Sequence, residues 1–167
     1  MDVQTVTHFR QILINLDSCL EKGVTYAETK KIELDVLANY RLAPDMFTLI
    51  KQIQSVCDSA KFCAAYLTEQ TPPKHDDTET TWMQMRERLK TVVNYLETFK
   101  TADFAKAESV KVKPNWAKGK WISGADYLNQ VAVPNFYFHA CMAYAILRHA
   151  GVNVGKMDYM GPVKLQD

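Results

Sequence analysis

The stretch PNFYFHACMAYAILRHA, residues 134–150 of the 167-residue chain, decides the fold class. Wound as a helix, this segment has apolar side chains on nearly every side, and its proline suits the first turn. Arg148 and His149 suit the negative end of a helix dipole, and Gly151 suits a C-terminal cap. We therefore expect a helix buried on all sides, either at the centre of a bundle or between the bundle and a second subunit.

A membrane span is the alternative for so apolar a segment. No Asp, Glu, Lys or Arg occurs between Tyr127 and Leu147. The same stretch nevertheless holds Asn129, Gln130, Asn135 and His139, and so many polar groups are costly for a lone helix in lipid. A buried helix of a soluble protein is the better interpretation, and we expect no membrane association.

Three further segments repeat apolar residues at spacings of three and four, which is the helical period. The first runs from Val6 to Leu20, and Gly23 suits its C-terminal end. The second begins with Pro44 and Asp45 in its first turn and continues to Leu67. The third is a stripe formed by Trp82, Met85, Leu89, Val92, Leu96 and Phe99. Together with residues 134–150 they predict an all-α fold, a four-helix bundle, as one domain spanning residues 1–167.

Turn-forming residues separate these helices. Residues 24–42 are irregular, with one short helix expected around 35–39. The run from Pro72 to Asp77 predicts a loop, after which Thr78 or Thr80 can cap the third helix. Residues 123–131 can form a helical lead-in to the last helix, and residues 155–167 are expected to lie over the surface as a tail.

Residues 101–123 form a long connection between the third and fourth helices. Val110 and Val112 alternate with lysines, which predicts a small two-stranded hairpin. Trp116 and Trp121 lie among several lysines, a mixture that nucleic-acid-binding surfaces also use. A solvated loop whose tryptophans fold back onto the bundle is the preferred interpretation, because nothing elsewhere extends the basic surface.

Composition sets few functional limits. Lys plus Arg number 20 and Asp plus Glu number 19, so no strong overall field attracts nucleic acid or anionic membranes. The four cysteines lie in apolar, helix-patterned segments without a CxxC pair, which favours reduced core thiols over disulfides or a zinc ribbon. The first residues show no secretory signal, and we expect a cytoplasmic protein.

His139 is the residue with the most chemical interest, because it is the histidine at the middle of the apolar segment. Asn135 precedes it by four residues and shares its helical face. An imidazole in a bundle core is either a hydrogen-bonded structural group or a metal ligand or acid–base group. Ser55 and Asp58 lie one turn apart on the second helix and complete the candidate pocket; Asp58 can equally be a solvated helix acid.

Several runs then resemble a known family. They are Pro134–His139, Ala143–Val152 and Gly155–Gly161, the signature PNFYFH…AYAILRHxGV…GKxDYxG, together with Arg41–Phe47, Gln52–Gln54, Asp58–Lys61 and Asp76–Thr81. In this order the sequence resembles a domain-of-unknown-function family of the DinB/YfiT-like superfamily. The resemblance spans nearly the whole chain. It implies a four-helix bundle that commonly dimerises through its helices.

The resemblance also implies an ancestral metal site. Many members of the superfamily hold a divalent metal on three histidines, and some use it to activate a low-molecular-weight thiol. On that alignment His139 matches one histidine of the last helix, Asn135 stands in place of the other, and Ser55 falls near the ligand of the second helix. Serine and asparagine oxygens are weak zinc ligands, so we expect no metal, or at most a weakly held divalent ion on His139.

Three hypotheses remain at this stage. The first is a metal-free bundle that binds a small molecule or a partner near Ser55, Asp58, Asn135 and His139, as a homodimer. The second is an enzyme, a metal-dependent hydrolase or a thiol-dependent transferase, that uses His139. The third is an interaction protein whose apolar last helix and lysine-rich loop serve assembly.

Overall fold

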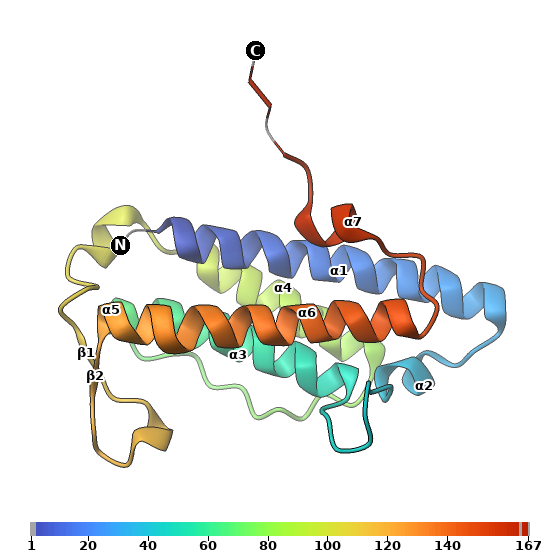
Figure 1. Cartoon of the computed structure of the whole chain (residues 1–167), viewed down its shortest axis with the longest axis horizontal. Coiled ribbons are helices and arrows are strands. Elements are labelled where there is room, and N and C mark those ends of the chain that lie inside the picture. Colours follow the sequence, from blue (N-terminus) through green and yellow to red (C-terminus); the bar gives the residue numbers. More distant parts are fainter. Residues whose placement is uncertain (1–2, 164, 167) are drawn as a thin grey trace.

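The computed structural model describes residues 3–163 and 165–166. Its helices and strands, in chain order, are α1 (Gln4–Lys30), α2 (Leu34–Ala38), α3 (Leu49–Leu67), α4 (Trp82–Glu97), η1 (Thr101–Phe104), β1 (Lys111–Val112), η2 (Asn115–Ala117), β2 (Ile122–Ser123), α5 (Gly124–Asp126), η3 (Tyr127–Ala132), α6 (Val133–His149) and α7 (Lys156–Met160). The four long helices α1, α3, α4 and α6 form a bundle (Figure 1), which confirms the predicted all-α class.

Neighbouring helices of the bundle do not all run antiparallel to one another. Helix α3 packs mainly against α6 and α4, whereas α1 packs against α4 and α6. Residues 68–81 form an extended segment that returns along α3, so α3 and α4 run in the same direction (Figure 1). This return places the segment beside polar residues of α3, a contact that becomes important at the site.

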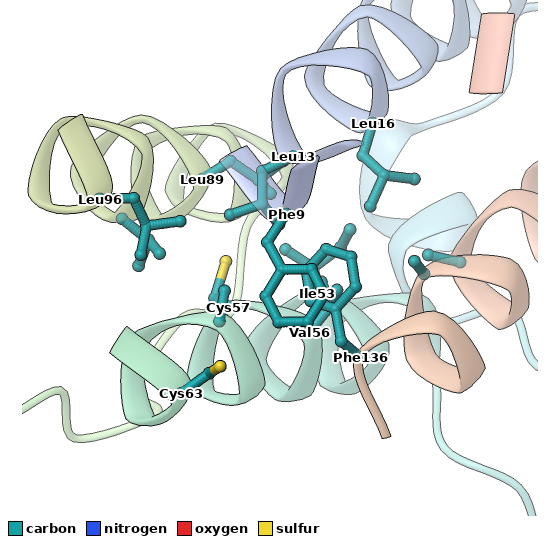
Figure 2. Packing of buried hydrophobic residues seen from close by; sticks show 14 of the residues in the cluster. Phe9, Leu13, Leu16, Ile53, Val56, Cys57, Cys63, Leu89, Leu96 and Phe136 are labelled. Atoms are coloured by element: carbon teal, nitrogen blue, oxygen red, sulfur yellow. The ribbon is translucent and has the colours of Figure 1, made fainter. Parts of the chain in front are cut away.

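The core lies where the apolar faces of the four helices meet. Phe9 of α1 and Phe136 of α6 stack with ring centroids 3.8 Å apart. Around them lie Leu13 and Leu16 of α1, Ile53, Val56 and Cys57 of α3, and Leu89 of α4 (Figure 2). The predicted stripe from Trp82 to Phe99 is buried throughout. Such a core is what the three-and-four spacing predicts.

The first helix does not stop at Gly23. Helix α1 continues to Lys30 and ends at Lys31, which adopts a left-handed conformation. Gly23 instead permits close packing, because a Cβ atom at this position would lie 2.6 Å from the Trp82 ring. The predicted helix end at Gly23 is therefore wrong. The local sequence could not show the contact between Gly23 and Trp82, because Trp82 belongs to another helix, α4.

Two predicted helix starts also move. Ala43-Pro44-Asp45 forms a turn, and α3 begins only at Leu49. Thr48 caps this helix, because its hydroxyl accepts a hydrogen bond from the Lys51 amide. Thr81, rather than Thr78 or Thr80, caps α4, in a reciprocal capping box with Gln84. The short helix expected near residues 35–39 is present as α2.

The long connection contains the predicted hairpin. Strands β1 and β2 pair antiparallel, with Lys111 opposite Ser123 and Val112 opposite Ile122. The tryptophans are not buried against the bundle as expected: Trp116 is 63% and Trp121 is 55% exposed. Trp121 instead lies beneath the Lys111 ammonium, 5.0 Å from the ring centroid.

The helical lead-in to the last helix is present and continuous with it. Ser123 caps α5, and the backbone then passes through the π-helix η3 before α6 begins. Pro134 lies in the first turn of α6, as predicted. A π-helix fits more residues into each turn than an α-helix, and such segments are frequent at functional sites.

Burial of the last helix on all sides is wrong for the single chain. Phe136, Ala140, Ala143, Ile146 and Leu147 of α6 are buried, but the opposite side is open and Phe138 is 53% exposed. The predicted tail, residues 155–167, lies over the surface in its first part: Lys22 of α1 pairs with Asp158 of α7 at 2.7 Å, and Asn15 Nδ2 donates to the Tyr159 carbonyl. After α7 the chain leaves the bundle (Figure 1), and positions 164 and 167 of the tail lie outside the described residues. In the described part of the chain, no helix combines the length and apolarity needed to cross a membrane.

Candidate functional site

A stripe of polar and aromatic residues runs along the face of α3 that meets α6. Gln52, Ser55, Ser59, Phe62 and Tyr66 follow one another at spacings of three and four, so they share one helical face. Gln52 is almost fully buried, and the other four residues line a cavity of about 270 Å³. Buried polar atoms need hydrogen-bond partners, and α6 supplies them for the buried residues Gln52 and Ser59.

Two hydrogen bonds join this stripe to α6. Asn135 Nδ2 donates to Ser59 Oγ at 2.6 Å. One turn later, His139 Nδ1 lies 2.7 Å from Gln52 Oε1. The Ser59 hydroxyl in turn donates to the Ser55 carbonyl at 2.8 Å. These bonds fix the side chains of Asn135 and His139 against α3.

His139 is held as a neutral imidazole. Burial lowers its pKa below the ordinary value, and the nearby positive charge of Lys51 lowers it further. Because the Gln52 oxygen accepts, Nδ1 carries the proton and Nε2 keeps its lone pair. The ring of Phe47 lies parallel to the imidazole, with centroids 6.2 Å apart.

Segments outside the bundle close the cavity. Pro114, Asn115 and Trp116 approach from the long connection, and Tyr127, Val131 and Ala132 come from η3. The return segment contributes Asp77, which pairs with Lys51 at 2.7 Å. The cavity therefore depends on α3, α6 and two connections that are far apart in sequence.

A network of charges lies beside the cavity and ties the return segment to the bundle. The Arg88 guanidinium of α4 contacts Asp58 at 2.7 Å, Asp77 at 3.2 Å and Glu79 at 2.9 Å. The Lys61 ammonium contacts Asp58 at 2.7 Å and His75 Nδ1 at 3.1 Å. The side chains of Arg88 and Lys61 are only 2% exposed, so both buried cations are paired with carboxylates.

All four sequence-derived candidates line the same cavity, namely Ser55, Asp58, Asn135 and His139. Asp58 is not a freely solvated acid, because it pairs with Lys61 and Arg88. The sequence reasoning missed Gln52 and Ser59, which make the direct bonds to His139 and Asn135. The three-and-four spacing of Gln52, Ser55 and Ser59 was the available signal, because polar residues at that period mark one face of α3.

The sequence and the fold are similar to those of known proteins. The model of a family described as a domain of unknown function, DUF1993, matches residues 1–160. The chain belongs to the DUF1993 family. A crystal structure of a DinB family member protein from Shewanella denitrificans superposes with a TM-score of 0.93 at 46% sequence identity, covering 97% of this chain and 92% of that one. No curated protein matches the sequence.

Membership in a DinB-like family raises the question of the superfamily's metal. The corresponding positions offer one imidazole, one amide and one hydroxyl, and the Asn135 amide already donates to Ser59. Among the described residues, no three His, Cys, Asp or Glu side chains are grouped so as to hold a metal ion. His139 alone retains the arrangement of a ligand, with its second nitrogen fixed by Gln52. This donor set does not fit a tightly bound divalent metal.

Proposed function

We propose that this DUF1993 protein is a small-molecule-binding helical bundle whose binding site is the cavity between α3 and α6. The observation that carries the proposal is the pairing of His139 with Gln52 and of Asn135 with Ser59 along one wall of that cavity. The bonds orient polar groups in advance, which reduces the entropic cost of binding. A volume of about 270 Å³ lies near the low end of the range for small-molecule sites, so a metabolite-sized ligand is expected.

The site is proposed to work without a tightly held metal. The neutral amide and hydroxyl at the Asn135 and Ser55 positions support this, because they are weak ligands for zinc, nickel or iron. Elemental analysis of purified protein tests the proposal, with His139→Ala as the informative variant and His149→Ala, at the exposed end of α6, as the matched control. A stoichiometric transition metal that is lost in His139→Ala and kept in His149→Ala would contradict it.

Binding itself is tested by a fragment screen followed by ¹H–¹⁵N correlation spectra. We expect hits that shift the amides of Ser55, Ser59 and Asn135, and a loss of these shifts in His139→Ala. The variant His149→Ala should bind the same fragments as the wild type. A screen whose hits cluster elsewhere on the surface, or that gives no hits, would overturn the cavity as the binding site.

An enzyme that uses His139 as a general base is the second candidate. The observation that favours it is the Nδ1 contact with Gln52, which leaves the unprotonated Nε2 of a neutral imidazole to accept a proton. Hydrolysis of an activated ester such as p-nitrophenyl acetate gives a first test. Turnover that is abolished in His139→Ala and unchanged in His149→Ala would support this candidate, whereas equal rates would remove it.

We infer that the protein acts as a homodimer through the open side of α6. Pro134, Phe138, Cys141 and Ala145 recur at spacings of four, three and four along that side, which is the pattern of a helix–helix seam. Two α6 helices packed face to face would bury this stripe and meet the expectation of an all-round buried helix.

The free thiols also support a reducing compartment, the cytoplasm.

Light scattering coupled to size exclusion tests the assembly. We expect a dimeric mass for the wild type and a monomeric mass for Phe138→Glu. Met83→Glu is the matched control, because Met83 on α4 is also exposed but lies outside the stripe. A monomeric wild type at every concentration, or a dimer that Met83→Glu disrupts instead, would contradict the interface.

A further inference from the structure

We propose that the cavity binds the positively charged ammonium group of its ligand, between the carboxylate of Asp58 and the ring faces of Trp116 and Tyr66. This inference rests on the proposed function, since it names the chemical class that the same cavity takes. It comes from the arrangement of charge and aromatic rings on the cavity wall.

The charges beside the cavity are layered. Three cations, Lys51, Lys61 and Arg88, balance three anions, Asp58, Asp77 and Glu79. The cations Lys61 and Arg88 are buried behind the wall, whereas the side chains of Asp58 and Asp77 are 27% and 30% exposed and line the cavity. Among the described residues that line the cavity, Lys51 is the one lysine or arginine; its side chain is 40% exposed and pairs with Asp77.

Both buried cations make their closest contact with the same oxygen of Asp58. Lys61 Nζ and Arg88 NH2 each lie 2.7 Å from Oδ1. Both cations are buried, while the exposed part of the carboxylate lies on the cavity wall. Asp58 and Asp77 are both ion-paired, but their exposed parts line the cavity together, against a single lining ammonium.

Aromatic rings form the rest of this end of the cavity. Phe62 and Tyr66 stack with centroids 5.5 Å apart, and Tyr127 meets Tyr66 edge-on at 5.7 Å. Burial raises the pKa of both tyrosines, so their hydroxyl groups stay uncharged. The Phe62 ring already has the Lys61 ammonium 4.6 Å from its centroid, which shows that an ammonium is accepted among these rings.

Trp116 completes the enclosure from the long connection. It lines the cavity although its side chain is largely exposed to solvent. An exposed tryptophan that lines the same cavity as two carboxylates suits an ammonium group, because the ring face attracts a cation and tryptophan does so most strongly. An anionic ligand would instead meet the exposed parts of two carboxylates, and a wholly apolar one would take these parts out of water without offering them a hydrogen bond.

Three probes of similar size test the charge preference: choline, its uncharged isostere 3,3-dimethylbutan-1-ol, and the anion butyrate. The chain has three tryptophans, so the indole N–H signals can be followed individually during each titration. We expect choline to shift the Trp116 signal and to bind at least about tenfold more tightly than the isostere. n-Butylamine then distinguishes a primary from a quaternary ammonium ligand.

The variant Trp116→Ala should lose choline binding, whereas Trp121→Ala should retain it. Trp121 is the matched control because it lies on the same connection and is similarly exposed, but does not line the cavity. Asp58→Asn should also lose binding. If circular dichroism shows that this variant does not fold, the choline affinity of the wild type should fall as sodium chloride is raised, because the charge attraction is screened.

The outcomes separate this inference from the function on which it rests. If the isostere or butyrate binds as tightly as choline and shifts Trp116, the cavity is a binding site but the ammonium preference is wrong. If choline shifts only the Trp121 signal, the inference is likewise overturned. If none of the probes shifts Trp116, the ammonium site is rejected, and the fragment screen alone then decides whether the cavity binds ligands.

Discussion

His139 of α6 and Gln52 of α3 form a direct polar contact across the bundle, with Nδ1 2.7 Å from Oε1. Gln52 is almost fully buried, so this amide is the fixed neighbour that sets the tautomer of the imidazole. The contact makes the ionisation of His139 sensitive to the residue at position 52.

Replacing Gln52 by glutamate should raise the pKa of His139 by about 1 to 2 pH units, because a carboxylate hydrogen-bonded to Nδ1 stabilises the imidazolium. An NMR pH titration of the His139 ring measures the change. Gln70→Glu is the control, since Gln70 follows α3 at an exposed position and adds the same charge. An unchanged His139 midpoint in Gln52→Glu would show that the imidazole does not face residue 52.

Gly23→Ala should destabilise the protein by about 1 to 3 kcal/mol. Alanine normally favours a helix interior over glycine, but here the added Cβ would lie 2.6 Å from the Trp82 ring. Urea unfolding followed by circular dichroism gives the free energy of unfolding. Gly155→Ala is the control for steric crowding, because the atom nearest to its added Cβ is 4.0 Å away, and it should lower stability by less than Gly23→Ala does. Stabilisation by Gly23→Ala would refute the close contact.

Arg88→Met should destabilise the protein by about 3 to 5 kcal/mol, because it removes the shared partner of three carboxylates from a buried site. The return segment should then become sensitive to limited proteolysis. Lys74→Met, which removes a highly exposed partner of Asp76, should leave both the urea midpoint and the proteolysis pattern unchanged. Equal behaviour of the two variants would mean that the buried network does not anchor the segment.

Stability should fall in two stages as the pH is lowered. Burial lowers the pKa of His75 and His139 from 6.5, so the unfolded chain takes up these protons first and folding loses stability below about pH 6.5. The charge of Arg88, and also that of Lys61, adds to the effect at His75, while Lys51 adds to it at His139.

The second stage comes from carboxylates. Burial works to raise the pKa of Asp77, but Lys51 and Arg88 outweigh it and the net pKa is lowered. Burial acts in the same direction at Glu79, where a backbone hydrogen bond, Gln54 and Arg88 again lower the net pKa. The stability from these lowered values is present above the ordinary carboxyl range and is lost as the pH falls through it.

Urea midpoints measured from pH 8 to pH 3 test both stages. The double variant His75→Gln/His139→Gln should flatten the profile above about pH 5 and keep the loss at lower pH. A wild-type midpoint that stays constant between pH 7.5 and pH 5.5 would contradict the first stage.

Much of the fold could be predicted because apolar spacing reports burial directly. The apolar stripe from Trp82 to Phe99 predicts one helix, and the alternating valines predict the hairpin; both are present. Gly23 and Pro44 were misread because each has two physical uses. A glycine can end a helix or admit a close neighbour, and a proline can begin a helix or form a turn. Only the contact with Trp82 decides the first case, and it joins residues from different helices.

The candidate site was only partly visible. His139 and Asn135 stood out because they are polar residues in an apolar segment. Gln52 and Ser59 did not, because polar residues are common on helices and their partners lie on α6. The pairing of Lys61 and Arg88 with the return segment could not be predicted, since the path of an extended loop leaves no periodic pattern.

The π-helix η3 has a geometric consequence for the whole end of the molecule. One extra residue in a helix turns everything before it by about 100° about the axis. The orientation of Tyr127 and of the hairpin that carries Trp116 therefore depends on the extra residue that the π-helix accommodates. We expect the deletion of one residue within 127–132 to straighten the helix and to move Tyr127 and Trp116 away from Asn135 and His139. The cavity would then be lost although every lining side chain of α3 stays in place.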